Sequence, residues 1–133
     1  EFKYPWYESR ALSALSELIL ARGELRQAEA ASTEALNLAR QIGALEPMVE
    51  ASLASARVFI EQSENIDTAA ELLREGIRLA ESGDLALPLP ALHFVLSQIL
   101  HRMGDDPGAH ASLQSARREE RRADRNMNPF CCR

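Results

Sequence analysis

The stretch Gly23-Glu24-Leu25-Arg26-Gln27-Ala28 recurs in altered form as Glu64-Asn65-Ile66-Asp67-Thr68-Ala69 and as Gly104-Asp105-Asp106-Pro107-Gly108-Ala109. Each copy lies between two stretches whose apolar residues recur every three to four positions, which predicts a helix on either side of a short turn. Seven residues after its alanine, each copy is followed by another small residue: Ala35, Gly76 and Ala116. The copies begin 41 and 40 residues apart. A repeat of this length predicts stacked helix pairs, each of which buries its apolar face only against the next pair.

The composition is that of one globular domain without a disulfide framework. The chain has 133 residues, of which 46% are hydrophobic and 26% charged, and its net charge is −5. This charge argues against non-specific binding to nucleic acid, which needs a basic surface. No apolar run approaches the roughly 20 residues of a membrane span, and no secretory signal is visible. Cys131 and Cys132 are adjacent and cannot join distant parts of the fold, so we expect a protein of the reducing cytoplasm.

Apolar periodicity predicts six helices and no strand. We expect the first helix to open at Pro5 and end at Gly23, and the second to cover residues 25–42. The expected starts of the other four are near Pro47, after Asn65 or Asp67 as N-cap, at Pro88 or Pro90, and after Asp106 as N-cap. The last helix is expected to end at about residue 123.

The helices group into one repeat domain with short extensions. The expected domain covers residues 5–125, with repeats at about 5–43, 47–83 and 88–125. Residues 1–4 are interpreted as a remnant of cloning or of a longer protein, and residues 126–133 as a C-terminal tail. In this tail Met127, Pro129 and Phe130 are expected to dock on an apolar face of this chain or of a neighbour.

The repeated pattern resembles the tetratricopeptide repeat over residues 8–121. The residues that carry the resemblance in the three repeats are Leu12, Leu15, Ser16, Ile19, Gly23, Leu25, Ala28 and Ala35; Leu53, Ala56, Ile60, Ile66, Ala69 and Gly76; and Leu96, Ser97, Leu100, Gly104, Ala109 and Ala116. Glu64 replaces the turn glycine of the second repeat, and Asp106 replaces a large residue in the third. The period exceeds the usual length of about 34 residues. This longer form resembles the helical sensor regions of large bacterial transcription activators of the maltose-regulator type.

The resemblance implies an all-α superhelical solenoid of three antiparallel helix pairs, whose first helices line a concave groove. Mapping the groove positions of the family onto this chain gives Arg10, Ser13, Glu17, Leu20 and Ala21; Ala51, Ala54, Val58, Glu61 and Gln62; and Ala91, Phe94, Gln98, His101 and Arg102. Among these, Arg10, His101 and Arg102 are expected to meet a carboxylate. An extended peptide or a partner's helix is the expected ligand, with a small effector as an alternative. The alternative interpretation is that these residues form only the exposed face of a scaffold whose real contact lies elsewhere.

The sequence carries no catalytic motif, and we expect no metal and no cofactor. His93, His101 and His110 lack the spacing of a helical metal site, and His93 falls at a helix-packing position. Residues 104–108 lack the alternating acids of a calcium loop. The charge run at residues 117–122 is interpreted as a solvated last helix, with an anionic docking patch as the alternative.

We therefore expect a non-catalytic protein-binding or peptide-binding module, in particular a sensor or interaction domain of a bacterial signalling or transcription regulator. Direct nucleic-acid or membrane binding by this segment is not expected. The alternative is a structural domain that dimerises a larger protein through an isologous contact.

Overall fold

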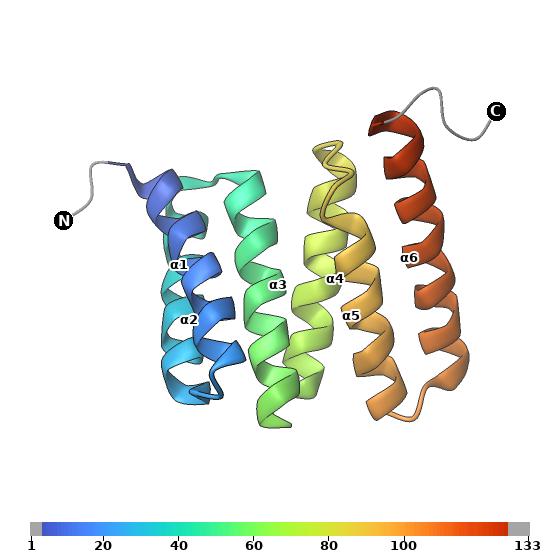
Figure 1. The fold of residues 1–133 in the computed structure, drawn as a ribbon, viewed down its shortest axis with the longest axis horizontal. Helices are drawn as coiled ribbons and strands as arrows, with labels where there is room; N and C mark the ends of the chain where they lie inside the picture. Colours follow the sequence, from blue (N-terminus) through green and yellow to red (C-terminus); the bar gives the residue numbers. More distant parts are fainter. Residues whose placement is uncertain (1–3, 128–133) are drawn as a thin grey trace.

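Residues 4–127 are described by the computed structural model, and they form six α-helices and no strand (Figure 1). The helices are α1 (Pro5–Ala21), α2 (Leu25–Ile42), α3 (Leu45–Gln62), α4 (Ile66–Ser82), α5 (Leu89–Arg102) and α6 (Asp106–Met127). The described chain is therefore all-α, as the periodicity predicts.

The helices are arranged in a repeat-like array that follows the chain. Figure 1 shows α1 and α2 together at one end of the long axis, then α3, then α4 and α5, and α6 at the opposite end. Each helix packs on the next one, and α3 also contacts both α1 and α5. Within the described range, the backbones of α2, α4 and α6 do not approach one another, and α2 meets α4 only through side chains, where Nη2 of Arg40 lies 3.9 Å from Oε1 of Glu75 and Leu36 shares an apolar cluster with Leu72. The backbones of α1, α3 and α5 thus lie close together on one side of the array, whereas α2, α4 and α6 are spaced more widely on the other.

The first helix pair is built from small residues. Alanines at 28, 31, 35 and 39 form the buried side of α2. On the facing helix, the Ser9 hydroxyl donates to the carbonyl oxygen of Ala35 at 2.8 Å, and the Ser16 hydroxyl donates to that of Ala28 at 2.8 Å. Small side chains let the two helix axes approach, and the serine hydroxyls find acceptors in the backbone of the neighbouring helix.

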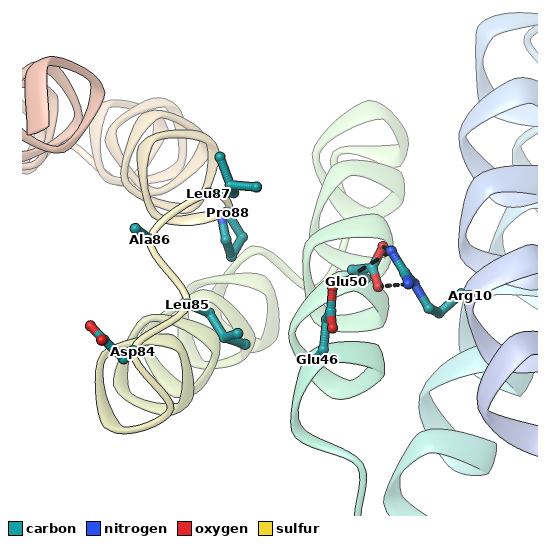
Figure 2. Close-up of a pocket in the computed structure, with 8 residues that line it drawn as sticks. All are labelled: Arg10, Glu46, Glu50, Asp84, Leu85, Ala86, Leu87 and Pro88. Atoms are coloured by element: carbon teal, nitrogen blue, oxygen red, sulfur yellow. Dashed lines mark hydrogen bonds and ion pairs between the residues drawn. The ribbon is translucent and has the colours of Figure 1, made fainter. Parts of the chain in front are cut away.

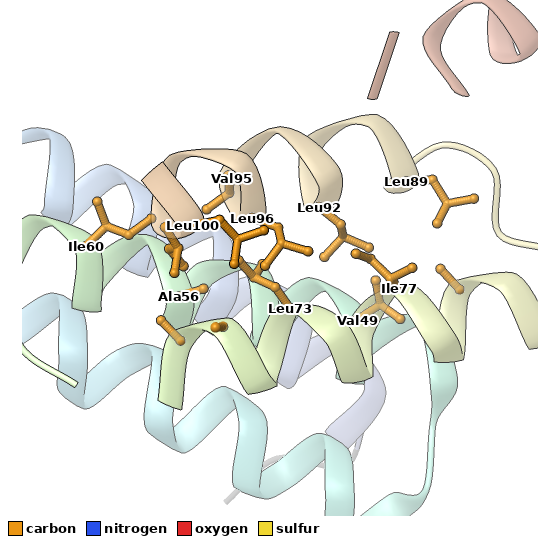
Figure 3. Close-up of a cluster of buried hydrophobic side chains, with 14 residues drawn as sticks. Val49, Ala56, Ile60, Leu73, Ile77, Leu89, Leu92, Val95, Leu96 and Leu100 are labelled. Carbon is orange, nitrogen blue, oxygen red and sulfur yellow. The ribbon is translucent and has the colours of Figure 1, made fainter. Parts of the chain in front are cut away.

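The main apolar core lies between α3, α4 and α5 (Figure 3). Leu73, Leu92 and Ile99 are among its fully buried side chains. A Cβ atom added to Gly76 would lie 3.2 Å from Cδ2 of Leu92 and 3.8 Å from Cβ of Ser52. The missing side chain of Gly76 therefore makes room for Leu92 where α5 crosses α4.

Three helix ends differ from the sequence-based expectation. α3 begins two residues before Pro47, because the first helical turn tolerates proline. α5 begins at Leu89, between the two prolines that were the expected starts. α6 continues to Met127 rather than ending at about residue 123, so the expected tail at 126–133 begins too early. Pro129, Phe130, Cys131 and Cys132 lie outside the described residues, as does the expected docking of the tail.

The N-cap of α6 is Asp105, not Asp106. The amide of Gly108 donates to Oδ1 of Asp105 at 2.9 Å, which satisfies one of the free amides of the first turn. Asp106 is instead the first helical residue, and its Oδ1 lies 2.8 Å from Nδ1 of His101. Asn65 does occupy the N-cap position of α4, but its side chain makes no capping bond.

The turns that end α1, α3 and α5 fix which residues of these helices are equivalent. Each turn contains a left-handed residue, namely Gly23 at φ 81°, Ser63 at φ 57° and Gly104 at φ 84°. The amides of these three residues donate to the carbonyls of Leu20, Ile60 and His101. Ser63, and not Glu64, is thus the counterpart of Gly23. The second turn has one more residue before its next helix, and Asn65 there is also left-handed, at φ 53°.

Replacing Ser63 with glycine is expected to stabilise the fold. A non-glycine residue in the left-handed region carries a penalty of roughly 1 kcal/mol, which glycine does not. We expect Ser63→Gly to raise the free energy of unfolding in urea by up to about 1 kcal/mol. Ser82→Gly is the matched control, since Ser82 ends α4 as an ordinary helical residue and glycine should weaken it. An equal decrease in the free energy of unfolding of both variants would contradict the left-handed conformation assigned to Ser63.

Candidate functional site

Two arginines, Arg10 of α1 and Arg57 of α3, make ion pairs between these helices on the side where α1, α3 and α5 touch. Nε of Arg10 lies 2.7 Å from Oε1 of Glu50, and Arg57 pairs with Glu17. Gln98 of α5 lines a depression beside Arg57. We call the surface of α1, α3 and α5 that carries these five residues the first-helix face.

The larger pocket of this face lies between α1, the start of α3 and the α4–α5 loop, and its volume is about 480 Å³. In Figure 2, Arg10 approaches from α1 and pairs with Glu50, while the loop lies on the opposite side. The lining residues are Arg10, Glu46, Glu50, Asp84, Leu85, Ala86, Leu87 and Pro88. The pocket therefore combines three carboxylates and one guanidinium with an apolar wall.

Arg10 is held in place by its neighbours. Besides Glu50, its Nη2 lies 3.6 Å from Oε1 of Glu46. Its guanidinium carbon also lies 4.7 Å from the centre of the Trp6 ring, within the range of a cation–π interaction. Because its charge is already matched, Arg10 is a poor candidate to bind an additional anion.

The smaller depression, of about 190 Å³, lies farther along the same face. Its lining residues are Leu20, Arg57, Ile60, Glu61, Phe94, Val95 and Gln98. An adjoining hollow of about 470 Å³ shares Arg57 and Phe94 and extends to α6. Phe94, which is 48% exposed, thus stands between two hollows. An exposed aromatic ring beside a guanidinium is typical of residues that anchor a binding partner.

The structure brings part of the predicted groove together. Arg10 lines the larger pocket, while Glu61, Phe94 and Gln98 line the smaller depression. Glu17 joins them through its ion pair with Arg57.

The predicted groove residues of α3 are largely wrong. Val58 and Ala51 are fully buried and Ala54 is 1% exposed. Their side of α3 packs on the first helix pair, where Ala51 clusters with Ala35 and Leu36. The error follows from the second turn, since aligning Glu64 with Gly23 shifts α3 by one residue. Ser13 of α1 is also buried, at 6% exposure, and does not present its side chain to a ligand.

Three other predicted groove residues make intramolecular contacts. Nε2 of Gln62 donates to Oε2 of Glu29 at 2.8 Å and so joins α3 to α2. Nη1 of Arg102 donates to the carbonyl oxygen of Ile60 at 2.6 Å. His101 pairs with Asp106, and both side chains are about three-quarters exposed. The expected binding of a carboxylate by Arg10, His101 and Arg102 therefore has no geometric support.

Sequence reasoning missed Glu50, Arg57 and the loop at residues 84–88. A signal for Arg57 was present, because it is the only charged residue between Glu50 and Glu61. A lone arginine in a run of small and apolar residues is expected to point away from the packed sides of its helix. The loop carried no such signal, because its place opposite Arg10 depends on how the helix pairs stack.

A further depression, of about 330 Å³, lies on the opposite side of the array between α2 and α4. Its rim is polar and includes Asn37, Arg40, Glu71 and Glu75, with Phe59 of α3 among its lining residues. This depression is the main competitor of the first-helix face as a ligand site.

The described residues show no sign of a metal centre or a membrane span. No group of three potential metal-ligating side chains comes together between residues 4 and 127. In the same range, no helix combines the length and the apolar character needed to cross a bilayer. The charge run of α6 is exposed except for Glu119, which is buried at 9% exposure and lies 3.8 Å from Arg122.

The half-buried His93 makes stability depend on pH. Burial lowers the pKa of His93 below 6.5, with nearby Arg118 acting in the same direction and Glu119 and Glu81 opposing it. Between this lowered pKa and the ordinary value, the unfolded state binds more protons, so stability falls as the pH drops below about 6.5. We expect the thermal midpoint to fall less in His93→Gln than in the parent between pH 7.5 and 5. His110→Gln is the control, and a parent-like fall in His93→Gln would contradict this role.

No protein-family model matches the chain, and no match is found among the curated proteins or among the solved structures. The function is therefore inferred from the chemistry of the first-helix face.

Proposed function

We propose that the chain is a non-catalytic binding module that takes a basic, extended peptide segment of a partner protein on its first-helix face. The observation that carries this proposal is the larger pocket, where three carboxylates and an apolar wall surround a single, already paired arginine. A small effector is the alternative ligand of the same pocket.

The charge of the pocket favours a cation. The single positive charge of Arg10 balances only one of the three negative charges, and Asp84 makes no ion pair with another described residue. A lysine or arginine of a partner would lay its methylene groups on Leu85 and Pro88 and direct its charge to Glu46 and Asp84. Such a contact combines apolar burial with a charge-assisted hydrogen bond.

The second anchor is Phe94. Its exposed ring and the neighbouring Leu20 offer an apolar contact, while Glu61 adds another carboxylate. An extended peptide that places a basic residue in the larger pocket and an apolar residue at Phe94 would use both ends of the face.

The helix packing supports a superhelical solenoid of three antiparallel pairs of the tetratricopeptide type. In residues 4–127 the backbones of α1, α3 and α5 lie closer together than those of α2, α4 and α6, which is the arrangement expected of an array that curves toward the first-helix face. In such arrays the inner face is an extended binding surface. We place the module in the cytoplasm, as a sensor or interaction domain of a bacterial signalling or transcription regulator.

Selection from a random peptide library tests the proposed function. We expect the enriched peptides to share a lysine or arginine and a large apolar residue. The double variant Glu46→Gln/Asp84→Asn is expected to weaken their binding at least about tenfold, which corresponds to about 1.4 kcal/mol. Asparagine tolerates the left-handed backbone of Asp84, at φ 56°, so the loop should keep its shape.

Matched controls separate this site from general charge effects. Glu34→Gln and Glu71→Gln remove exposed carboxylates from α2 and α4 and are expected to leave the affinity unchanged. Phe94→Ala is expected to weaken binding, whereas Met103→Ala, which removes another exposed apolar side chain, is not. Equal affinity of the double variant and the parent, or the absence of any enriched peptide, would contradict the proposal.

The alternative function, self-association, depends on a different surface. The outer side of α1 exposes Tyr7, Leu15 and Leu18. Light scattering of the parent chain across a concentration series tests for such a dimer.

A further inference from the structure

The outer side of α1 is an exposed apolar stripe at helical spacing. Tyr7, Leu15 and Leu18 are 68%, 47% and 65% exposed, and Ala11 and Ala14 between them are exposed as well. We call these five residues the α1 stripe. In Figure 1, α1 lies at the end of the array, with α2 and α3 on its other sides.

The same positions are buried in the two later repeats. The left-handed residues Gly23, Ser63 and Gly104 set the register between α1, α3 and α5. In this register, the counterparts of Ala11, Ala14, Leu15 and Leu18 are Ala51, Ala54, Ser55 and Val58 in α3, and Leu92, Val95, Leu96 and Ile99 in α5. All eight counterparts are at most 6% exposed. The α1 stripe is therefore exposed because of its place in the array, not because of its position in the repeat.

The structure shows what covers these positions in α3 and α5. Ala51 clusters with Ala35 and Leu36 of α2. Leu92 lies against Gly76 of α4, within the cluster that also holds Ile77. In both cases the cover is the second helix of the preceding pair, which presents a small residue followed by Leu or Ile.

The opposite end of the array does not offer such a cover. In α6, Ala116 keeps the small residue, but Arg117 and Glu120 stand where α4 has Ile77 and Ala80. Both Arg117 and Glu120 are exposed. The outer side of α6 is thus polar, as the terminal surface of a repeat array must be for solubility, whereas the outer side of α1 is apolar.

We propose that the α1 stripe is a docking surface for a helix pair of the same repeat type, whose second helix presents a small residue followed by Leu or Ile. This surface is separate from the peptide site of the first-helix face. A second copy of the chain is a poorer occupant, because within residues 4–127 the one second helix that no following pair covers is the polar α6. Two α1 stripes facing each other would also oppose Leu15 and Leu18 without the hollow that Gly76 provides for Leu92.

The test adds such a helix pair in front of residues 5–133, in place of residues 1–4. A copy of residues 45–82 is joined through the sequence of residues 42–44 to Pro5, so that its second helix precedes α1 as α2 precedes α3. We expect the extended protein to unfold in one transition, at a midpoint at least about 5 °C above that of the parent. The single tryptophan, Trp6, lies in the first turn of α1, and its emission should shift to shorter wavelengths when the stripe is covered.

A matched control reproduces the polar end of the array. Ile77→Arg and Ala80→Glu are made in the added copy only, which gives its second helix the pattern of Arg117 and Glu120. We expect this control to lose the rise in midpoint and the emission shift. Equal rises in both extended proteins, or no rise in either, would overturn the proposal.

The parent chain provides an independent measurement. Light scattering across a concentration series is expected to give the mass of a monomer, both for the parent and for Leu15→Asp/Leu18→Asp. A parent dimer that this double variant converts to a monomer would show that a second copy covers the stripe, and would overturn the proposal whether or not the added copy folds.

Discussion

Val58→Asp is expected to abolish the native fold at ordinary temperatures. Val58 is fully buried on the side of α3 that packs on the first helix pair. A carboxylate there would lose its water without gaining a partner, and an unpaired buried charge lowers stability by several kcal/mol. A loss above about 4 kcal/mol is a large part of the stability of a single domain. Circular dichroism and urea unfolding would measure it.

Leu18→Asp is the matched control for this substitution. Leu18 occupies the position in α1 that Val58 occupies in α3, but it is 65% exposed. We expect its free energy of unfolding to change by less than about 0.5 kcal/mol, as for most surface substitutions. A folded and stable Val58→Asp protein would contradict the register assigned to α3 and would return Val58 to the groove.

Leu96→Ala is expected to lower the free energy of unfolding by about 3 kcal/mol. Leu96 is 6% exposed and belongs to the core cluster between α3, α4 and α5. Removing its side chain gives up apolar burial and leaves a cavity that the packed helices fill only in part. The urea midpoint would fall while the slope of the transition stays unchanged.

Leu15→Ala places the same substitution at the equivalent position of α1. Leu15 is 47% exposed, because no helix pair covers the α1 stripe. We expect Leu15→Ala to lower the free energy of unfolding by well under 1 kcal/mol, because alanine leaves no enclosed cavity there and favours the helix. Similar losses in Leu15→Ala and Leu96→Ala would mean that the stripe is already covered in solution.

The six helices could be predicted because their signals are local. Apolar spacing, helix-ending glycines and first-turn prolines each act within a few residues, and they located α1 and α2 closely. The remaining errors are at helix ends, because a single capping residue can determine where a helix begins. Asp105 and Asp106 are chemically alike, and only the bond from Gly108 to Asp105 distinguishes them.

The candidate site was predicted only in part, because it depends on register and on stacking. The groove residues of α1 and α5 were placed in the same register, since both helices end at a glycine. Ser63 takes the left-handed conformation without any glycine to indicate it. As a result Arg57 was missed, and Val58 was named in its place. The contact of the α4–α5 loop with the Arg10 pocket joins residues far apart in the chain, which no local pattern specifies.

The measurement that tests the proposed function most directly is the mapping of amide chemical shifts while a library-selected basic peptide is titrated into the protein. We expect the shifted amides to lie along α1, α3 and α5 and in the loop at residues 84–88, with the largest changes near Glu46, Asp84 and Phe94. Shifts confined to α2 and α4, around Asn37 and Glu71, would place the ligand on the opposite side of the array and would contradict binding by the first-helix face.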